Sequence, residues 1–196
     1  LVELVELGVI NGSKKTIDTG KVVTSIIDGT NKVYKFVDRN KDVLVMQTSY
    51  TNDFATLSQC ENQISVNAAL EIDLTGQCCS ESIGSRQFSG TGGQAETAMG
   101  AQLAKGGKSF MVMYSTAMVK NADGTRIPTS KIVAQLKQGA TVSLQRNDVQ
   151  YIATEYGMVN LRGLSIPQRA EALISIANPD FRADLRREAT ELGILR

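Results

Sequence analysis

At 196 residues, with 42% hydrophobic and 21% charged residues, the chain has the size and composition of one ordinary globular domain. A formal net charge of +1, only 5% aromatic residues and no tryptophan argue against nucleic acid or an anionic membrane surface as the main partner. The absence of histidine excludes a Ser-His-Asp or Cys-His relay and a CxxC…H zinc site within the chain, so we expect no metal.

The start of the chain and its cysteines indicate whether it is a fragment and in which compartment it folds. The first segment, LVELVELGVI, has the pattern of a helix already in progress and does not begin with methionine, so we expect a fragment that lacks its true N-terminus. No apolar run approaches the ~20 residues needed to span a bilayer. The odd set Cys60, Cys78 and Cys79 is a poor disulfide framework and fits a reducing compartment, so the sequence predicts a cytoplasmic protein with no membrane partner.

In chain order, helical spacing alternates with short apolar runs. The segments with helical patterns are 1–7, 30–39, 95–105, 169–177 (capped by Ser165) and 180–195. The segments with strand patterns are 22–27, 43–47, 63–76, 108–115, 140–144 and 149–157, while 130–136 fits a short strand or helix. Residues 49–53 and 121–128 have the composition of a loop and a turn. This alternation predicts a single domain over 1–196, a three-layer α/β fold with a mixed, largely parallel sheet.

The stretch FSGTGGQ, residues 88–94, concentrates three glycines between a short strand pattern and a helix. Glycines let backbone N–H groups approach a ligand closely, and the start of the following helix offers further unpaired N–H donors. The stretch lacks both the full G-x-G-x-x-G spacing and a Gly-Lys-Ser/Thr, so it is neither a dinucleotide fingerprint nor a phosphate P-loop. It predicts an anion or oxyanion site, or else a tight turn into a helix.

A carboxylate and two cysteines are the other chemical candidates. Glu155 in TEYG directly follows a predicted strand, which is where α/β proteins bind ligands, although it fits a surface loop residue equally well. Cys78 and Cys79 lack a histidine to activate a thiolate, so we expect them to be small buried residues.

Several segments, taken together and in order, resemble the C-terminal half of the acetyl-CoA hydrolase/transferase family. They are LVELVELGVINGSKKT, SVNAALEIDLTGQ, SESIGSRQFSGTGGQ, KGGKSF, SKIV, RNDVQYIATEYGMVNLRG and RAEALISIANPDF. The resemblance implies a CoA-transferase-like α/β domain that uses an acyl-CoA and a short-chain carboxylate as substrates and has no bound cofactor, coenzyme A being carried by the substrate. It also implies the N-terminal half of the same subunit as a partner and a homo-oligomer for the full-length protein.

The resemblance also implies roles for residues of this chain. Gly93 corresponds to the family glycine whose N–H lies at the oxyanion, with Gly92 and Gln94 shaping its loop. Asn52 resembles the asparagine that stabilises the thioester oxygen, although Asn-Asp-Phe stands here where the family has Asn-His-Pro. Glu155 resembles a second acidic residue at the site. The resemblance makes Lys120 and Lys131 candidates for the CoA phosphates.

The family nucleophile is a glutamate in a His-Ser/Thr-Glu motif, which would precede Leu1. We therefore expect the chain alone to be catalytically incomplete, and Glu3 and Glu6 not to take that role. Three alternatives stay open: an acetyl-CoA hydrolase, a non-catalytic CoA-binding or oligomerisation module, and a generic nucleotide-binding protein. The last is disfavoured because Lys108 stands where the ribose-binding acid is expected.

Overall fold

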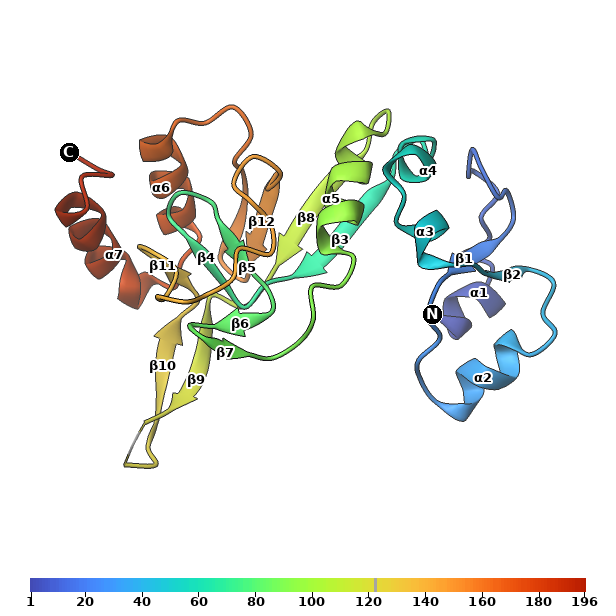
Figure 1. Cartoon of the computed structure of the whole chain (residues 1–196), viewed down its shortest axis with the longest axis horizontal. Helices are drawn as coiled ribbons and strands as arrows, with labels where there is room; N and C mark the ends of the chain where they lie inside the picture. The colour runs from blue at the N-terminus through green and yellow to red at the C-terminus, as the bar shows by residue number, and fades with distance from the viewer. Residues whose placement is uncertain (122) are drawn as a thin grey trace. The chain divides into compact units, whose positions relative to one another are not determined.

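A computed structural model describes residues 1–121 and 123–196 (Figure 1). The chain divides into two compact units. The first unit comprises Leu1–Gln63 and Met99–Gly107, and the second comprises Ile64–Ala98 and Lys108–Arg196. Helix α5 (Gln94–Leu103) contains the boundary between them. The single domain expected over 1–196 stays a prediction.

The first unit contains helices joined to a small parallel sheet. Its first four elements are α1 (Val2–Glu6), β1 (Val22–Thr24), α2 (Asn31–Val37) and β2 (Val43–Val45), and β1 pairs with β2 in parallel. These confirm the helices and strands expected in the first 47 residues, with shorter bounds. Gly8 adopts a φ of +70° directly after the first helix, the left-handed conformation in which glycine ends a helix.

The loop expected at residues 49–53 is wrong for 49–51, which are helical, and only Asn52 and Asp53 form a connection. Two short helices, α3 (Thr48–Thr51) and α4 (Phe54–Ser58), occupy this region. Asn52 and Asp53 separate them, and the Asp53 carboxylate accepts a hydrogen bond of 2.8 Å from the N–H of Thr56, so it caps the second helix. Ser49 and Thr51 are therefore helical, and Asn52 and Asp53 are the caps between the two helices.

The second unit is built on a four-stranded sheet in the order β13-β12-β8-β3. The strands are β3 (Ile64–Ala68), β8 (Lys108–Val112), β12 (Tyr151–Thr154) and β13 (Gly157–Asn160). Both pairs on β8 are parallel and β12–β13 is antiparallel. The sheet is therefore mixed and largely parallel, which confirms the predicted α/β class.

Smaller sheets flank the main one. They contain β4 (Glu71–Asp73), β5 (Cys78–Cys79) and β11 (Ile132–Val133) in one sheet, and β6 (Ser82–Ile83) with β7 (Arg86–Gln87) in another. The single strand expected at 63–76 is therefore two strands of different sheets, β3 and β4. The strand expected at 140–144 is wrong, because only Leu144 forms a bridge there, with Cys78.

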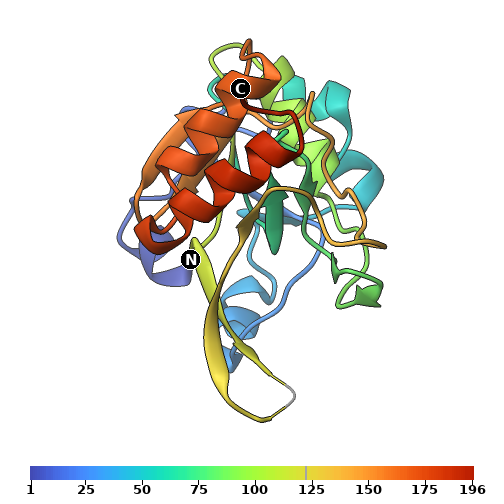
Figure 2. The ribbon, with the colours of Figure 1, turned by 90° about the vertical axis from the view of Figure 1, so that its left-hand side faces the viewer.

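The start of α5, up to Ala98, and two further helices complete the core of the second unit. After α5, α6 (Ile166–Ser175) and α7 (Pro179–Glu191) lie side by side near the C-terminus (Figures 1 and 2). The predicted cap is confirmed, since the N–H of Ser165 donates to the Gln168 side chain over 2.9 Å. One hydrophobic cluster joins Met111 and Ile152 of the sheet to Leu173 and Leu185 of these helices.

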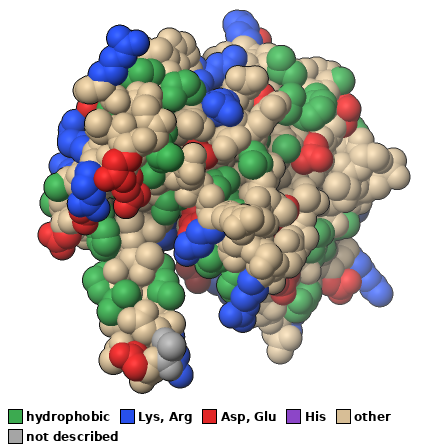
Figure 3. All heavy atoms as spheres, turned by 60° about the vertical axis from the view of Figure 1, so that its left-hand side comes forward, with side chains coloured by type: hydrophobic (Ala, Val, Ile, Leu, Met, Phe, Trp, Pro, Cys, Tyr) green, Lys and Arg blue, Asp and Glu red, His purple; other side chains and the backbone are tan. Residues whose placement is uncertain are grey.

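A hairpin of β9 (Thr116–Lys120) and β10 (Arg126–Ser130) projects from the second unit (Figure 2). The turn predicted over 121–128 is too long at its end, because β10 already begins at Arg126. Ala122, within this range, lies outside the described residues. Exposed hydrophobic side chains, among them Met118, Val119 and Ile127, run along the hairpin (Figure 3).

Candidate functional site

The glycine-rich stretch forms the approach to helix α5. Gly92 is exposed and adopts a φ of +60°, which favours glycine, and Gly93 directly precedes the helix. The carbonyl of Gly93 accepts hydrogen bonds from the Thr97 N–H at 3.0 Å and the Thr97 hydroxyl at 2.9 Å. These bonds fix the first turn, whose leading N–H groups have no acceptor within the helix. The loop can therefore present backbone donors to an anion.

Gln94 anchors this loop from inside the unit. Its side chain is buried, and its Nε2 atom lies 3.4 Å from the Met111 sulfur and 3.7 Å from the Cys78 sulfur. The side chain thus points into the core, which suits a residue that shapes the loop.

The start of α5 is tied to the carboxyl end of β3. Asn67, near the end of that strand, donates a hydrogen bond of 3.1 Å from Nδ2 to the Thr97 hydroxyl. The next residue, Ala68, lines a cavity at the carboxyl ends of the parallel strands. The glycine loop and this cavity therefore lie at the same edge of the sheet, where open α/β sheets bind ligands.

The cavity has a volume of about 520 Å³ and lies entirely within the second unit. Its lining is mostly apolar, with one cation and one carboxylate: Ala68, Ala69, Val112, Met113, Tyr114, Lys131, Ala153, Thr154 and Glu155. Such a mixture of apolar walls and a few charged groups is typical of small-molecule sites.

Glu155 is held by one buried serine. The fully buried Ser115 donates to the two carboxylate oxygens, from its N–H at 2.8 Å and from its hydroxyl at 2.7 Å. Desolvation by itself raises the pKa of Glu155, but the hydrogen bonds from Ser115 and from the backbone, with the Lys131 charge, outweigh it. The pKa therefore lies below its ordinary value, and Glu155 is an oriented carboxylate rather than a proton donor near neutral pH. Sequence reasoning missed Ser115, because it is only the last residue of the predicted strand 108–115 and lies directly before β9.

The other predicted residues lie in different places. Lys131 shares the cavity with Glu155, whereas Lys120 is exposed on the hairpin. Asn52 follows α3 in the first unit, and its Oδ1 atom accepts a hydrogen bond of 3.0 Å from the Thr51 hydroxyl. The second unit thus brings together Glu155 and Lys131, and places Gly92, Gly93 and Gln94 along the same edge.

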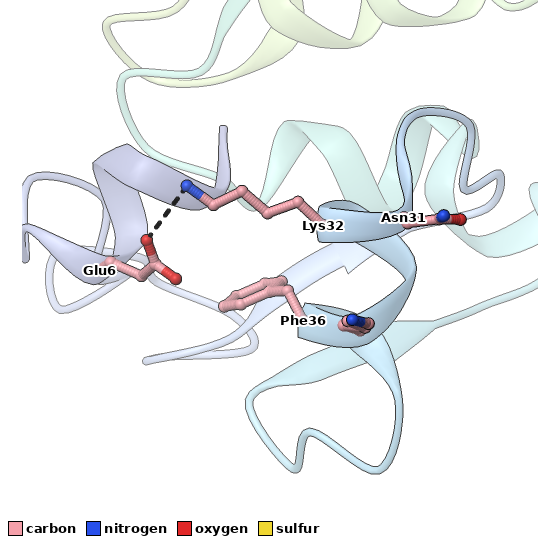
Figure 4. A pocket seen from close by; sticks show the side chains of 5 residues that line it. Glu6, Asn31, Lys32 and Phe36 are labelled. Carbon is pink, nitrogen blue, oxygen red and sulfur yellow. Dashed lines mark ion pairs between the residues drawn. The ribbon is translucent and has the colours of Figure 1, made fainter.

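A second hollow lies in the first unit, between α1 and α2 (Figure 4). Lys32 spans it and pairs with Glu3 at 3.2 Å and Glu6 at 3.6 Å. Each of these side chains is more than half exposed. Exposed pairs of this kind contribute little, and none of the predicted site residues lines this hollow.

Cys78 and Cys79 are fully buried, as expected from the sequence. Desolvation raises the pKa of the Cys78 thiol to about 11, so it is protonated at neutral pH. Cys60 is half-buried.

We expect a thiol reagent to modify only Cys60 within minutes in the native chain, and all three cysteines after denaturation. Fast reaction of more than one thiol in the native state would contradict this burial.

Among the described residues, no group of three or more acidic or cysteine side chains is arranged to hold a metal ion. Within the same residues, no helix combines the length and apolar character needed to cross a bilayer.

Comparisons with known proteins give consistent matches. Residues 29–189 match the family model described as acetyl-CoA hydrolase/transferase C-terminal domain. The chain is 43% identical to 4-hydroxybutyrate coenzyme A transferase from Clostridium kluyveri over 188 residues, which cover 96% of this chain and 42% of that protein. It is 42% identical to butyryl-CoA:acetate CoA-transferase from Anaerostipes caccae over 195 residues, which cover 100% of this chain and 43% of that protein. The chain thus spans less than half the length of these relatives.

A solved structure shows the same fold. The crystal structure of RipA from Yersinia pestis superimposes with a TM-score of 0.88 at 37% identity, covering 100% of this chain and 42% of that one.

Proposed function

Because the chain belongs to the acetyl-CoA hydrolase/transferase family and matches its C-terminal domain, we propose that it is the C-terminal domain of a CoA-transferase. The substrates we propose are acyl-CoA thioesters and short-chain carboxylates of the acetyl, butyryl or 4-hydroxybutyryl type. The observation that supports this most is identity of 42–43% to two CoA-transferases over nearly the whole chain.

The proposed reaction needs no histidine. A glutamate carboxylate outside this chain attacks the thioester carbonyl. A C–O bond forms, the C–S bond breaks and CoA departs as a thiolate, and the product on the enzyme is an acyl-glutamyl anhydride. The thiolate then attacks the glutamyl carbonyl, so a C–S bond forms a glutamyl-CoA thioester, the anhydride C–O bond breaks and the acyl group leaves as a carboxylate. An acceptor carboxylate reverses these steps with its own acyl group. Each attack creates an oxyanion, which backbone N–H donors can stabilise.

In this proposal the chain supplies the oxyanion side of the site. The Gly93 N–H faces the developing negative charge, with Gly92 and Gln94 holding the loop. Asn52 stabilises the thioester oxygen, and Glu155 orders the substrate or the nucleophile loop. Lys120, on the exposed hairpin, can reach the phosphates of CoA. The nucleophile belongs to the part of the subunit that this chain does not span, so the 196-residue chain alone is inactive.

We further propose a cytoplasmic enzyme of acetate and short-chain fatty acid metabolism that works as a homo-oligomer containing the N-terminal half of the same subunit. The buried, unpaired Cys78 and Cys79 support a reducing compartment.

The test uses the full-length protein that contains this chain. We expect it to convert acetyl-CoA plus butyrate into butyryl-CoA plus acetate, and chromatography of the two thioesters measures this conversion. When no acceptor acid is present, we expect little loss of thioester. Equal loss of acetyl-CoA with and without butyrate would instead establish a hydrolase. No reaction of either kind would favour a binding module.

A further inference from the structure

Lys131 is a half-buried cation that no carboxylate of the described residues contacts as a direct ion pair. None of the ion pairs formed among the described residues includes it. Its ammonium donates one hydrogen bond of 2.9 Å, to the carbonyl of Ala69. An ammonium has three donors, so two remain for a ligand. Desolvation lowers the pKa of Lys131 from its ordinary value and outweighs the opposing influence of nearby acidic groups, Glu155 and Glu71 among them.

The backbone around Lys131 is fixed at both ends. Its N–H donates to the Ser115 carbonyl at 2.8 Å, and its own carbonyl accepts from the Ile72 N–H at 2.9 Å. Ser115 is also the residue that holds Glu155. The cation and the carboxylate of the cavity are thus positioned by one shared residue, as expected for a preorganised site.

The walls beside Lys131 indicate the kind of anion that fits. Ala68, Val112 and Ala153 come from the ends of three neighbouring strands and are small and apolar. They suit a short hydrocarbon chain and offer nothing to a hydrophilic pyrophosphate. A ligand with one negative end and a short apolar tail matches the cavity.

We infer that Lys131 binds the carboxylate of the free acid substrate, with the hydrocarbon tail of that acid against Ala68, Val112 and Ala153. This inference rests on the proposed transferase function and makes Lys131 a specificity residue for the acid rather than a partner of the CoA phosphates. Ser115 holds both oxygens of Glu155, which forms no direct ion pair with Lys131 among the described residues, so the ammonium donors stay open to the acid. The acid carboxylate accepts from the two ammonium donors that Lys131 leaves open.

The test compares two lysine variants of the full-length enzyme. Lys131→Met keeps an unbranched side chain of similar length and removes the charge. Lys108→Met makes the same change at an exposed lysine at the opposite end of β8. We expect Lys131→Met to raise KM for butyrate about tenfold, equivalent to about 1.4 kcal/mol, with KM for acetyl-CoA within about twofold of the wild type. Lys108→Met should leave both constants unchanged. A rise in KM for acetyl-CoA with KM for butyrate unchanged would overturn the inference in favour of the CoA phosphates.

A second measurement uses the unmodified full-length protein and does not depend on activity. Amine-reactive labelling of Lys131, quantified by peptide mass spectrometry, is expected to slow when butyrate is added, but not when the neutral butyramide is added. Labelling of Lys108 should not change. Equal protection by both compounds, or by neither, would overturn the inference even if Lys131→Met fails to fold. Absence of CoA transfer by the wild type would contradict the proposed function instead, and the labelling result would still decide whether Lys131 binds a carboxylate.

Discussion

Replacing Gly93 by alanine is expected to lower the turnover of the full-length enzyme about 100-fold while leaving its fold intact. The positive-φ glycines do not include Gly93, so alanine is compatible with its backbone conformation. The added methyl group is instead expected to crowd the space next to the Gly93 N–H, which we propose to face the oxyanion. A displacement of about 1 Å in a catalytic group is enough for an effect of this size. Steady-state kinetics with acetyl-CoA and butyrate, together with thermal unfolding, measure the two parts of the prediction.

Gly90→Ala is the matched control for this experiment. It makes the same change three residues earlier in the loop, where an added Cβ meets no atom within 4 Å and where φ is not positive. We expect it to retain wild-type turnover. Equal loss in both variants would show that the loop tolerates no methyl group anywhere, and normal turnover in Gly93→Ala with an intact fold would remove Gly93 from the oxyanion site.

The sequence predicted the fold class well because apolar periodicity marks the strands of the main sheet. Residues 108–115 and 149–157 each contain a strand of that sheet, and helical spacing predicted α5, α6 and α7. The pattern at 63–76 was less informative. Its alternation continues across the point where the chain leaves one sheet for another, at Ala69 and Leu70, and periodicity alone carries no sign of such a change of partner.

Burial within the main sheet also departs from what alternation suggests. In β3 the apolar Ile64 and Val66 are 51% and 61% exposed, while Ser65 between them is buried. Alternation locates a strand but does not say which of its faces is covered. That choice depends on packing against helices that lie far away in the sequence.

The candidate site was predicted only in part, for a related reason. Glu155 and the glycine stretch stand out locally, one at a strand end and the other before a helix. Ser115 does not, because its importance comes from two hydrogen bonds to a residue 40 positions away. Lys131 was found through the resemblance but connected with the CoA phosphates, and only the cavity places it beside Glu155.

Replacing Glu155 by glutamine is expected to lower kcat/KM about 100-fold, because the amide has the shape of the carboxylate without its charge. One end of the amide also presents N–H groups to Ser115, which already donates to both oxygens of Glu155. Glu188→Gln, an identical change on the exposed side of α7, should have no effect. Full activity of Glu155→Gln would exclude a role for the Glu155 charge in the reaction.

The pH dependence separates the charge of Glu155 from its shape, and Ser115→Ala is the variant that reveals it. In the wild type, hydrogen bonds from Ser115 contribute to a pKa of Glu155 below its ordinary value. Because this pKa is lowered, ionised Glu155 stabilises the folded protein. That stabilisation is fully present above the ordinary pKa, 4.5, and is lost as the pH falls through the lower, folded-state pKa. Removing the Ser115 hydroxyl takes away one donor to the charged form, so the pKa of Glu155 rises and the acid limb of the kcat/KM profile moves to higher pH. A Ser115→Ala enzyme with lower activity but an unmoved acid limb would mean that Ser115 supports the fold of the site rather than the ionisation of Glu155.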